Sequence, residues 1–249
     1  MKHQRIRSKI LLAALTGVTS ATVAAVPPVA PQTSSAIQLS VGGVISPGSC
    51  TIAQGPLAFD MKAINAASLS KKDETPIAPL SSKLSITCGS ANASFTLSVS
   101  NTNKSSTVPV TTQLTHAGTG IKADQAYVYD LFNPAEGNKR IGRYAFQFRD
   151  FTYKKMGEGE TRQKALVVTS ADKVTWANGA DTDANSGQLK NDGSTYVSFA
   201  DKAATGTPVR ANSFEGNIVV GAVIRPTSEF STANELSFEG SATITLTYL

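Results

Sequence analysis

The stretch Leu236–Leu249, which reads LSFEGSATITLTYL, decides the fold of this chain. Apolar or small residues occupy every second position, and Ser, Thr or Glu occupies the positions between them. This period of two is typical of a half-buried β-strand, because successive side chains of a strand point to opposite faces. The set that we expect to face inward is Leu236, Phe238, Gly240, Ala242, Ile244, Leu246 and Tyr248. The sequence therefore predicts a strand that continues to the end of the sequence.

Residues 1–25 have the composition of a secretory signal. A basic head is followed by the apolar stretch Ile10–Leu15, and Val23–Ala25 offers small residues at a cleavage position. The Thr, Ser and Gly residues of 16–22 leave too little apolar length for a membrane anchor. We predict cleavage near Ala25 and export of a soluble mature protein with no further membrane span.

The charge of the chain argues against a nucleic-acid partner. The sequence has 23 Lys and Arg and 18 Asp and Glu residues, which gives a net charge of +5. Residues 1–25 hold four basic residues and no acidic one, so the rest has 23 − 4 = 19 basic residues against 18 acidic ones. A mature chain with a net charge of +1 lacks the excess of positive charge that binds a polyanion such as a nucleic acid.

Two cysteines, Cys50 and Cys88, remain after the signal. An even count in an exported chain predicts a disulfide rather than two buried free thiols. A loop of this length would be stabilised by roughly 3 to 4 kcal/mol in the chain-entropy model.

The rest of the sequence favours an all-β fold, most simply a sandwich. Short runs rich in Val, Thr and aromatic residues alternate with Gly, Asn, Asp and Pro clusters, and no helical stripe follows the signal. The predicted strands are Ile37–Ile45, Lys83–Cys88, Ser94–Ser100, Thr107–Leu114, Ala126–Phe132, Tyr144–Tyr153, Ala165–Thr169, Tyr196–Ala200 and Asn217–Ile224. We find no internal repeat and no linker that divides residues 47–249 into two domains.

Three features together resemble the structural subunits of chaperone–usher pili. The first is an alternating stretch directly after the Pro- and Ser-rich leader, within residues 26–46: Ile37, Leu39, Val41, Gly43 and Ile45. The second is the spacing of 38 residues between the two cysteines, and the third is the alternating C-terminal strand with a penultimate aromatic residue. In that family the exported subunit is an immunoglobulin-like sandwich that lacks its last strand, and a disulfide joins its first two strands.

The resemblance implies an assembly mechanism by strand addition. A sandwich without its last strand has a groove beside its C-terminal strand, and a periplasmic chaperone fills this groove first. At the outer-membrane usher, the N-terminal extension of a neighbouring identical or related subunit replaces the chaperone. The resemblance assigns the alternating residues of 37–45 to the donated strand, with Gly43 where the two backbones approach most closely. It assigns the groove to Phe238, Gly240, Ala242, Ile244, Leu246 and Tyr248.

The resemblance also implies a location and leaves alternatives open. It places the protein at the cell surface after export through the periplasm, as a pilus subunit that serves adhesion. Residues 47–249 would form the pilin-like sandwich, with the excess length between about Asn101 and Phe214 on the exterior. The family often has a glycine just before its last strand, whereas Asn234–Leu236 occupies that place here and the nearest glycine is Gly240. The alternatives are a tip or adaptor adhesin and a closed, monomeric, carbohydrate-binding sandwich.

The sequence predicts neither an enzyme nor a cofactor. A single histidine, His116, follows the signal, and no nucleophile motif accompanies it. The acidic run 181–192 resembles a calcium loop, but Ser186 stands at the turn position that requires Gly and Asp192 replaces the bidentate Glu. We therefore predict a solvated loop there and no metal site.

The segment Arg140–Lys155 interleaves basic and aromatic residues. Such a pattern can bind a polyanion or a glycan. Its aromatic residues nevertheless share one strand face, with a break at Arg149-Asp150. We therefore expect a core strand that contains a β-bulge.

Overall fold

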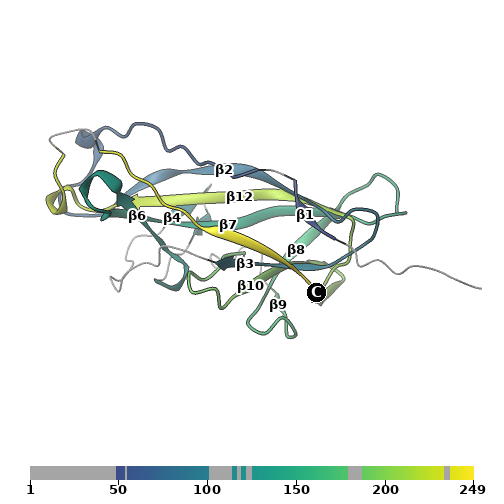
Figure 1. Cartoon of the computed structure of the whole chain (residues 1–249). Helices are drawn as coiled ribbons and strands as arrows, with labels where there is room; N and C mark the ends of the chain where they lie inside the picture. Colours follow the sequence, from purple (N-terminus) through teal and green to yellow (C-terminus); the bar gives the residue numbers. More distant parts are fainter. Residues whose placement is uncertain are drawn as a thin grey trace, which may run out of the picture. The chain divides into compact units, whose positions relative to one another are not determined.

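The fold is built from antiparallel β-strands (Figure 1). The computed structural model describes residues 49–53, 55–100, 114–116, 119–121, 125–178, 187–232 and 236–249. These residues all belong to the compact unit Ser46–Leu249. The predicted signal, leader and donor strand, together with most of the predicted strand Thr107–Leu114, lie outside the described residues.

The secondary structure confirms the all-β prediction. The strands are β1 (Thr51–Ile52), β2 (Thr75–Thr87), β3 (Phe95–Ser100), β4 (Leu114–His116), β5 (Thr119–Ile121), β6 (Tyr129–Asn133), β7 (Lys139–Lys154), β8 (Gln163–Ser170), β9 (Ala177–Asn178), β10 (Tyr196–Asp201), β11 (Ala204–Pro208), β12 (Ser213–Ile224) and β13 (Thr243–Tyr248). The only helical elements in the described part of the chain are short 3₁₀ turns, at Ala66–Ser68, Gln125–Tyr127, Pro134–Glu136 and Thr227–Glu229. None of the helices described here has the length and apolar character needed to cross a membrane.

Eleven of these strands form one antiparallel sheet that is nearly closed on itself, and β4 and β5 form a separate two-stranded sheet. Its hydrogen-bonded order is β1-β2-β12-β7-β8-β10-β3-β13, with β6 beside β7, β9 beside β8 and β11 beside β10. The β7–β8 hairpin pairs only where Thr152 and Tyr153 face Lys164 and Gln163. Beyond this short pairing, β2, β12 and β7 form one layer and β10, β3 and β13 form the other (Figure 1). The arrangement is therefore a sandwich, and within the sheet order its two layers are joined by the β7–β8 pairing.

Aromatic side chains from both layers meet in one core. The ring of Phe151 on β7 stacks on that of Phe199 on β10, with centroids 4.1 Å apart. Phe95 on β3 packs edge-on against Phe214 on β12 at 4.9 Å. These four side chains are almost completely buried, as is Phe148. Burial of such large rings is the main stabilising term for a sandwich.

Strand β7 contains the predicted bulge. The pairing of β7 with β12 shifts between Glu215 and Asn217, and Asp150 has the left-handed φ of 55°. The extra residue turns the Phe151 ring over Gly216, where a Cβ atom would lie 2.2 Å from the ring. The basic and aromatic segment is therefore a core strand with a bulge, as predicted, and Gly216 makes room for it.

Part of the enlarged middle region covers the outer face of the first layer. Val128, Ala145, Val219 and Val223 form a second buried cluster on that face. The hairpin β4–β5 lies against this layer, with β4 next to β2 and β12. Burial on both faces explains why the centre of β7 has no exposed residue.

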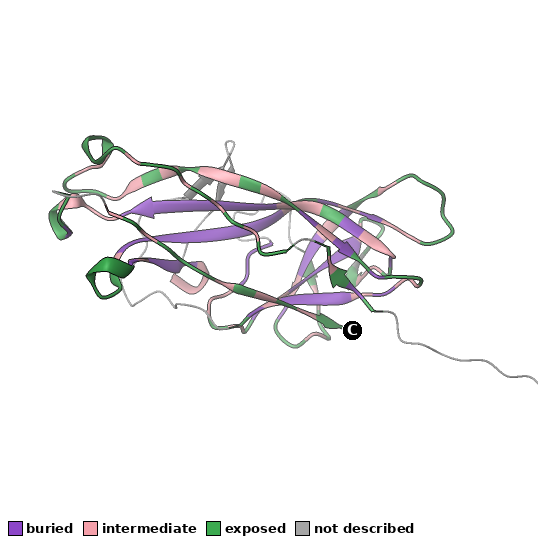
Figure 2. Ribbon diagram, turned by 45° about the horizontal axis from the view of Figure 1, so that its top comes forward, coloured by how far each residue is buried: buried purple, intermediate pink, exposed green. Residues whose placement is uncertain are grey.

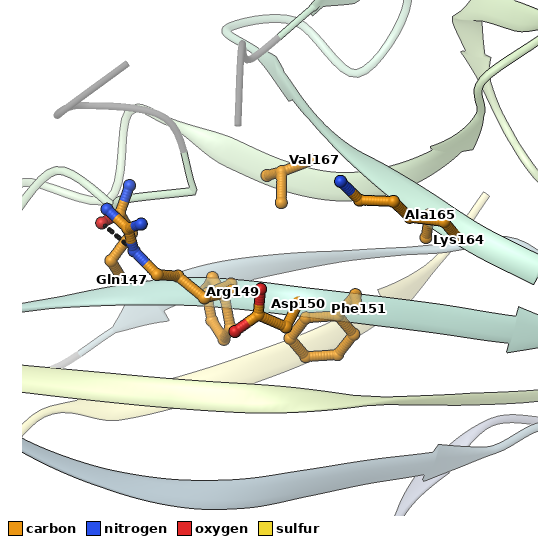
Figure 3. Close-up of a pocket in the computed structure, with 8 residues that line it drawn as sticks. Gln147, Arg149, Asp150, Phe151, Lys164, Ala165 and Val167 are labelled. Carbon is orange, nitrogen blue, oxygen red and sulfur yellow. Dashed lines mark hydrogen bonds between the residues drawn. The ribbon is translucent and has the colours of Figure 1, made fainter. Parts of the chain in front are cut away.

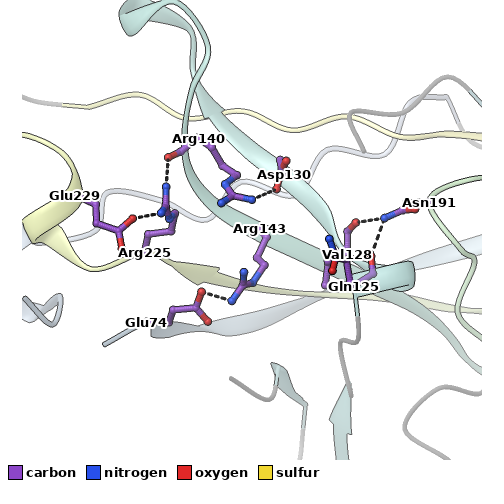
Figure 4. Close-up of polar contacts among 9 residues, drawn as sticks. All are labelled: Glu74, Gln125, Val128, Asp130, Arg140, Arg143, Asn191, Arg225 and Glu229. Atoms are coloured by element: carbon purple, nitrogen blue, oxygen red, sulfur yellow. Dashed lines mark hydrogen bonds and ion pairs between the residues drawn. The ribbon is translucent and has the colours of Figure 1, made fainter. Parts of the chain in front are cut away.

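A buried ion pair also lies in this layer (Figure 4). Arg143 on β7 donates to Glu74, and their side chains are only 3% and 13% exposed. A second pair, Arg140 with Asp130, is formed at 3.5 Å between β7 and β6. These pairs join β6 and the residue before β2 to the long strand β7.

Several strand boundaries differ from the prediction. Strand β2 begins at Thr75, eight residues before the predicted Lys83, and includes Pro76 and Pro79. Prolines fit there because they lie on a strand with an open edge, where a missing N–H breaks no ladder bond. The last regular strand begins at Thr243 rather than Leu236. The segment before it pairs instead with β6, through Glu239 and Phe132.

Candidate strand-acceptor site

The last strand of the sheet has one open edge. Strand β13 pairs with β3 over its full length, from Thr243 opposite Ser100 to Tyr248 opposite Phe95. No other strand in the described part of the chain pairs with β13. At the opposite end of the sheet order, β1 pairs with only the last two residues of β2. The sheet therefore stops short of closure between these two ends.

The inner face of β13 covers the core incompletely. Ile244 and Leu246 pack against the core cluster but are only half-buried, and the threonines that alternate with them, Thr243, Thr245 and Thr247, are exposed. On the neighbouring strand β3, Leu97 and Val99 are 0% and 5% exposed. The predicted alternation of half-buried and exposed residues is thus present in β13. On the side of β13 that faces away from β3, no further described strand covers the core.

A second extended segment borders the same core without joining a sheet. Leu57, Phe59 and Met61 are half-buried against the core, whereas Ala58 and Asp60 are exposed. Within the described ranges, no backbone group of residues 55–61 bonds to another backbone group. In Figure 2 this segment and β13 are green and pink ribbons that cross in front of the buried purple strands. The alternation is that of a strand, but the ladder that a strand requires is missing.

We use the term seam for the part of the core that β13 and the segment Leu57–Met61 cover only incompletely. Both borders supply half-buried apolar side chains to one core, and both have backbone groups without a strand partner in the described structure. Unpaired backbone next to apolar surface is the usual template for the addition of a further strand. The seam is therefore the candidate functional site.

One end of the seam is closed by Tyr248 and Cys50. The Tyr248 hydroxyl donates to the Cys50 carbonyl oxygen at 2.7 Å. Cys50 forms the predicted disulfide with Cys88, with an S–S distance of 2.09 Å. This contact connects the C-terminal strand directly with the residue before β1.

On the other side of β13, the C-terminal segment meets β6 before the regular strand begins. Phe132 and Glu239 exchange two backbone hydrogen bonds, each of 2.9 Å. Immediately after this bridge, a Cβ on Gly240 would lie 2.6 Å from Cε1 of Tyr144 and 3.0 Å from the Asp130 carbonyl oxygen. Because the regular strand begins at Thr243, Gly240 lies shortly before it.

The two edges of the sheet differ in their protection against strand addition. The open edge of β2 contains Pro76, Pro79 and Lys83, which all hinder pairing with a further strand. Residues 241–249 contain no proline and no charged side chain. Of these two edges, β13 is therefore the one that is chemically suited to accept a strand.

A cavity of about 80 Å³ lies elsewhere, between β7 and β8 (Figure 3). It is lined by Gln147, Phe148, Arg149, Asp150, Phe151, Lys164, Ala165 and Val167. Arg149 Nε donates to Gln147 Oε1 at 2.8 Å. The cavity follows from the bulge, because β7 and β8 separate directly beyond their short pairing.

The remaining predicted sites are only partly described. Asp181, Asp183 and Asn185 of the calcium-like run lie outside the described residues, and Asp192 accepts a hydrogen bond from Ser194 N at 2.8 Å. His116 ends strand β4. No cluster of three or more His, Cys, Asp or Glu residues that could hold a metal ion occurs in the described ranges.

Comparison with known proteins supplies no family for this chain. No protein-family model matches the sequence, and a search of curated proteins finds no relative.

Proposed function

We propose that the protein is a structural subunit of a chaperone–usher surface pilus and that it polymerises by donor-strand exchange for adhesion. The observation that supports this function is the seam. An incomplete sheet whose uncharged, proline-free edge lies beside half-buried apolar side chains is the acceptor that such a mechanism requires.

The N-terminal extension has the composition of a matching donor. Residues 37–45 would span about 30 Å in an extended conformation, which is enough to follow β13 along its length. Ile37, Leu39, Val41 and Ile45 fall on one face of such a strand, toward the half-buried residues of the seam. Burial of four side chains of this size contributes roughly 6 to 12 kcal/mol before the cost of ordering.

The proposal names three partners. A periplasmic chaperone would cover the seam of the newly exported subunit, and an outer-membrane usher would be the place where the donor strand replaces it. The third partner is the neighbouring identical or related subunit that supplies residues 37–45. Without any of these partners, the apolar residues of the seam remain in contact with water, so the isolated subunit should be less stable and more prone to association than a subunit that has received a strand.

Two alternatives make different predictions for the same chain. A tip or adaptor adhesin would also accept a strand at the seam, but its enlarged middle region would bind a surface ligand. A secreted, monomeric, carbohydrate-binding sandwich would have no use for strand addition.

The proposal is tested on material sheared from cells that express the protein with its chaperone and usher. Gel electrophoresis of unboiled samples should show a ladder of polymers that collapses to one band after boiling, because strand-exchanged joints are durable but non-covalent. A single monomer band in both samples, with the protein recovered in the medium, would identify the closed sandwich instead.

A further inference from the structure

The Tyr248–Cys50 contact joins two groups that are held by opposite layers. The backbone of Tyr248 pairs with Phe95, and Leu249 N bonds to the Ser94 carbonyl oxygen at 3.1 Å, so this end of β13 is fixed to β3. Cys50 is fixed to the end of β2 by its disulfide with Cys88. The hydrogen bond between them therefore bridges the two layers and the two ends of the sheet order.

The hydrogen bond between Tyr248 and Cys50 lies at one end of the seam. Directly after Cys50, residues Thr51 and Ile52 pair with β2, and Ala53 N bonds to the Ser85 carbonyl oxygen at 2.9 Å. Backbone pairing stops beyond this point, and the Leu57–Met61 border begins. A strand added beside β13 therefore meets the Tyr248 side chain at the end where the two borders converge.

Tyr248 is exposed enough for its side chain to move away from Cys50, which is buried. Its side chain is 48% exposed, whereas Cys50 is 4% exposed. The Tyr248 ring is not one of the apolar side chains that pack against the core cluster, and its hydroxyl makes the hydrogen bond to Cys50. The backbone at Cys50 is anchored by the disulfide and by the pairing of Thr51 with β2.

We infer that the Tyr248–Cys50 hydrogen bond is a latch that an added strand must open, and that it slows strand addition and limits its extent. This inference rests on the proposed function, because it assumes that a strand enters the seam. In the latched state the accessible part of β13 ends before Tyr248. In the open state an added strand can extend to the Cys50 end and pair there.

The test uses the mature chain and a synthetic peptide of residues 37–45 with a fluorescent label. The variant Tyr248→Phe removes the hydroxyl and keeps the ring, and Tyr196→Phe on β10 is the matched control. We expect the association rate of the peptide to rise about two- to tenfold in Tyr248→Phe, the range for the loss of one competing hydrogen bond, and to stay unchanged in the control. Hydrogen exchange should show peptide-induced protection at residues 49–52 that is greater in Tyr248→Phe than in the native chain.

The possible outcomes distinguish a failure of the latch from a failure of the proposed function. If the native chain does not bind the peptide, the proposed function fails, and with it the basis of the latch. If it binds but Tyr248→Phe binds at the same rate or more slowly, the latch is wrong and strand addition still stands. A purely structural role of Tyr248 would lower the thermal midpoint without raising the association rate, and this result would also overturn the latch.

Discussion

Gly240 lies so close to the ring of Tyr144 that no other residue fits there without a shift. An added Cβ would be 2.6 Å from Cε1 of Tyr144 and 2.9 Å from Cδ2 of Leu131. Tyr144 is buried, and burial raises the pKa of its hydroxyl. The C-terminal segment thus crosses between the layers at a point where only a glycine leaves room for a core aromatic ring.

Replacement of Gly240 by alanine should therefore destabilise the fold. We expect a loss of about 1 to 3 kcal/mol, because the ring and the neighbouring backbone must move to accept the methyl group. The matched control is Gly206→Ala on β11, where no atom lies within 4 Å of the added Cβ. Urea unfolding followed by tryptophan fluorescence measures both variants, and equal midpoints would show that the crossing is not tightly packed.

The disulfide should contribute strongly to stability. Cys50 and Cys88 are 38 residues apart, and a loop of this length corresponds to about 4 kcal/mol in the chain-entropy model. The double variant Cys50→Ala with Cys88→Ala should lose stability of this order. Intact-mass measurement after alkylation, with and without reductant, checks the bond itself. Two alkylated thiols in native, unreduced protein would contradict it.

Much of this arrangement is predictable from the sequence. The disulfide follows from an even cysteine count in a chain with a predicted secretory signal. Strands β3, β7, β8, β10 and β12 follow from runs of alternating or β-branched residues, and the bulge follows from the break at Arg149-Asp150. These features depend on neighbours in the chain or on composition, which a sequence displays directly.

Other features depend on distant partners and could not be predicted. The first half of β2 contains Pro76 and Pro79, which argue against a strand until its open edge is known. The border segment Leu57–Met61 has too few residues and too many turn formers around it to stand out. The last strand is shorter than its alternation suggests, because Glu239 pairs with Phe132, over one hundred positions earlier in the chain. The burial of Arg143 could not be foreseen without its partner Glu74.

Loss of one partner of the Arg143–Glu74 pair should cost more than loss of a surface pair. Arg143→Met leaves the Glu74 carboxylate largely buried without its cation, and we expect a loss of about 3 to 5 kcal/mol. Lys139→Gln, which removes an exposed pair with Glu136, should change the free energy of unfolding by less than about 0.5 kcal/mol. Chemical denaturation of both variants makes the comparison, and similar small losses would show that the Arg143 pair contributes no net stability.

The turn after β8 should respond to acid. The Thr175 and Val174 amides and the Ser170 hydroxyl donate to the Asp172 carboxylate and lower its pKa from 3.8 to about 2. A lowered pKa stabilises the folded state above the unfolded value, and this contribution disappears as the pH falls from about 4 to about 2. The stability of Asp172→Asn should therefore vary less with pH in this window. An NMR titration of Asp172 with a midpoint near 4 would contradict the account.

The donor strand should tolerate no large side chain at Gly43. If the donor and acceptor backbones approach each other at this position, Gly43→Leu introduces a clash and should prevent fibre growth from purified subunit–chaperone complexes. Gly42→Leu, on the opposite face of the strand, is the matched control and should polymerise. Normal fibres from both variants would show that no close approach occurs at residue 43.

The most direct test of strand addition at the seam compares Val41→Asp with Ser40→Asp in fibre formation from purified subunit–chaperone complexes. Adjacent residues of a strand face opposite sides, so only the charge at position 41 would be buried in the neighbouring subunit, where a carboxylate without a partner is strongly disfavoured. The account predicts boiling-sensitive polymers from Ser40→Asp, none from Val41→Asp, and normal chaperone complexes from both. Equal polymerisation of the two variants would contradict it, because residues 37–45 would then not enter the seam of a neighbour.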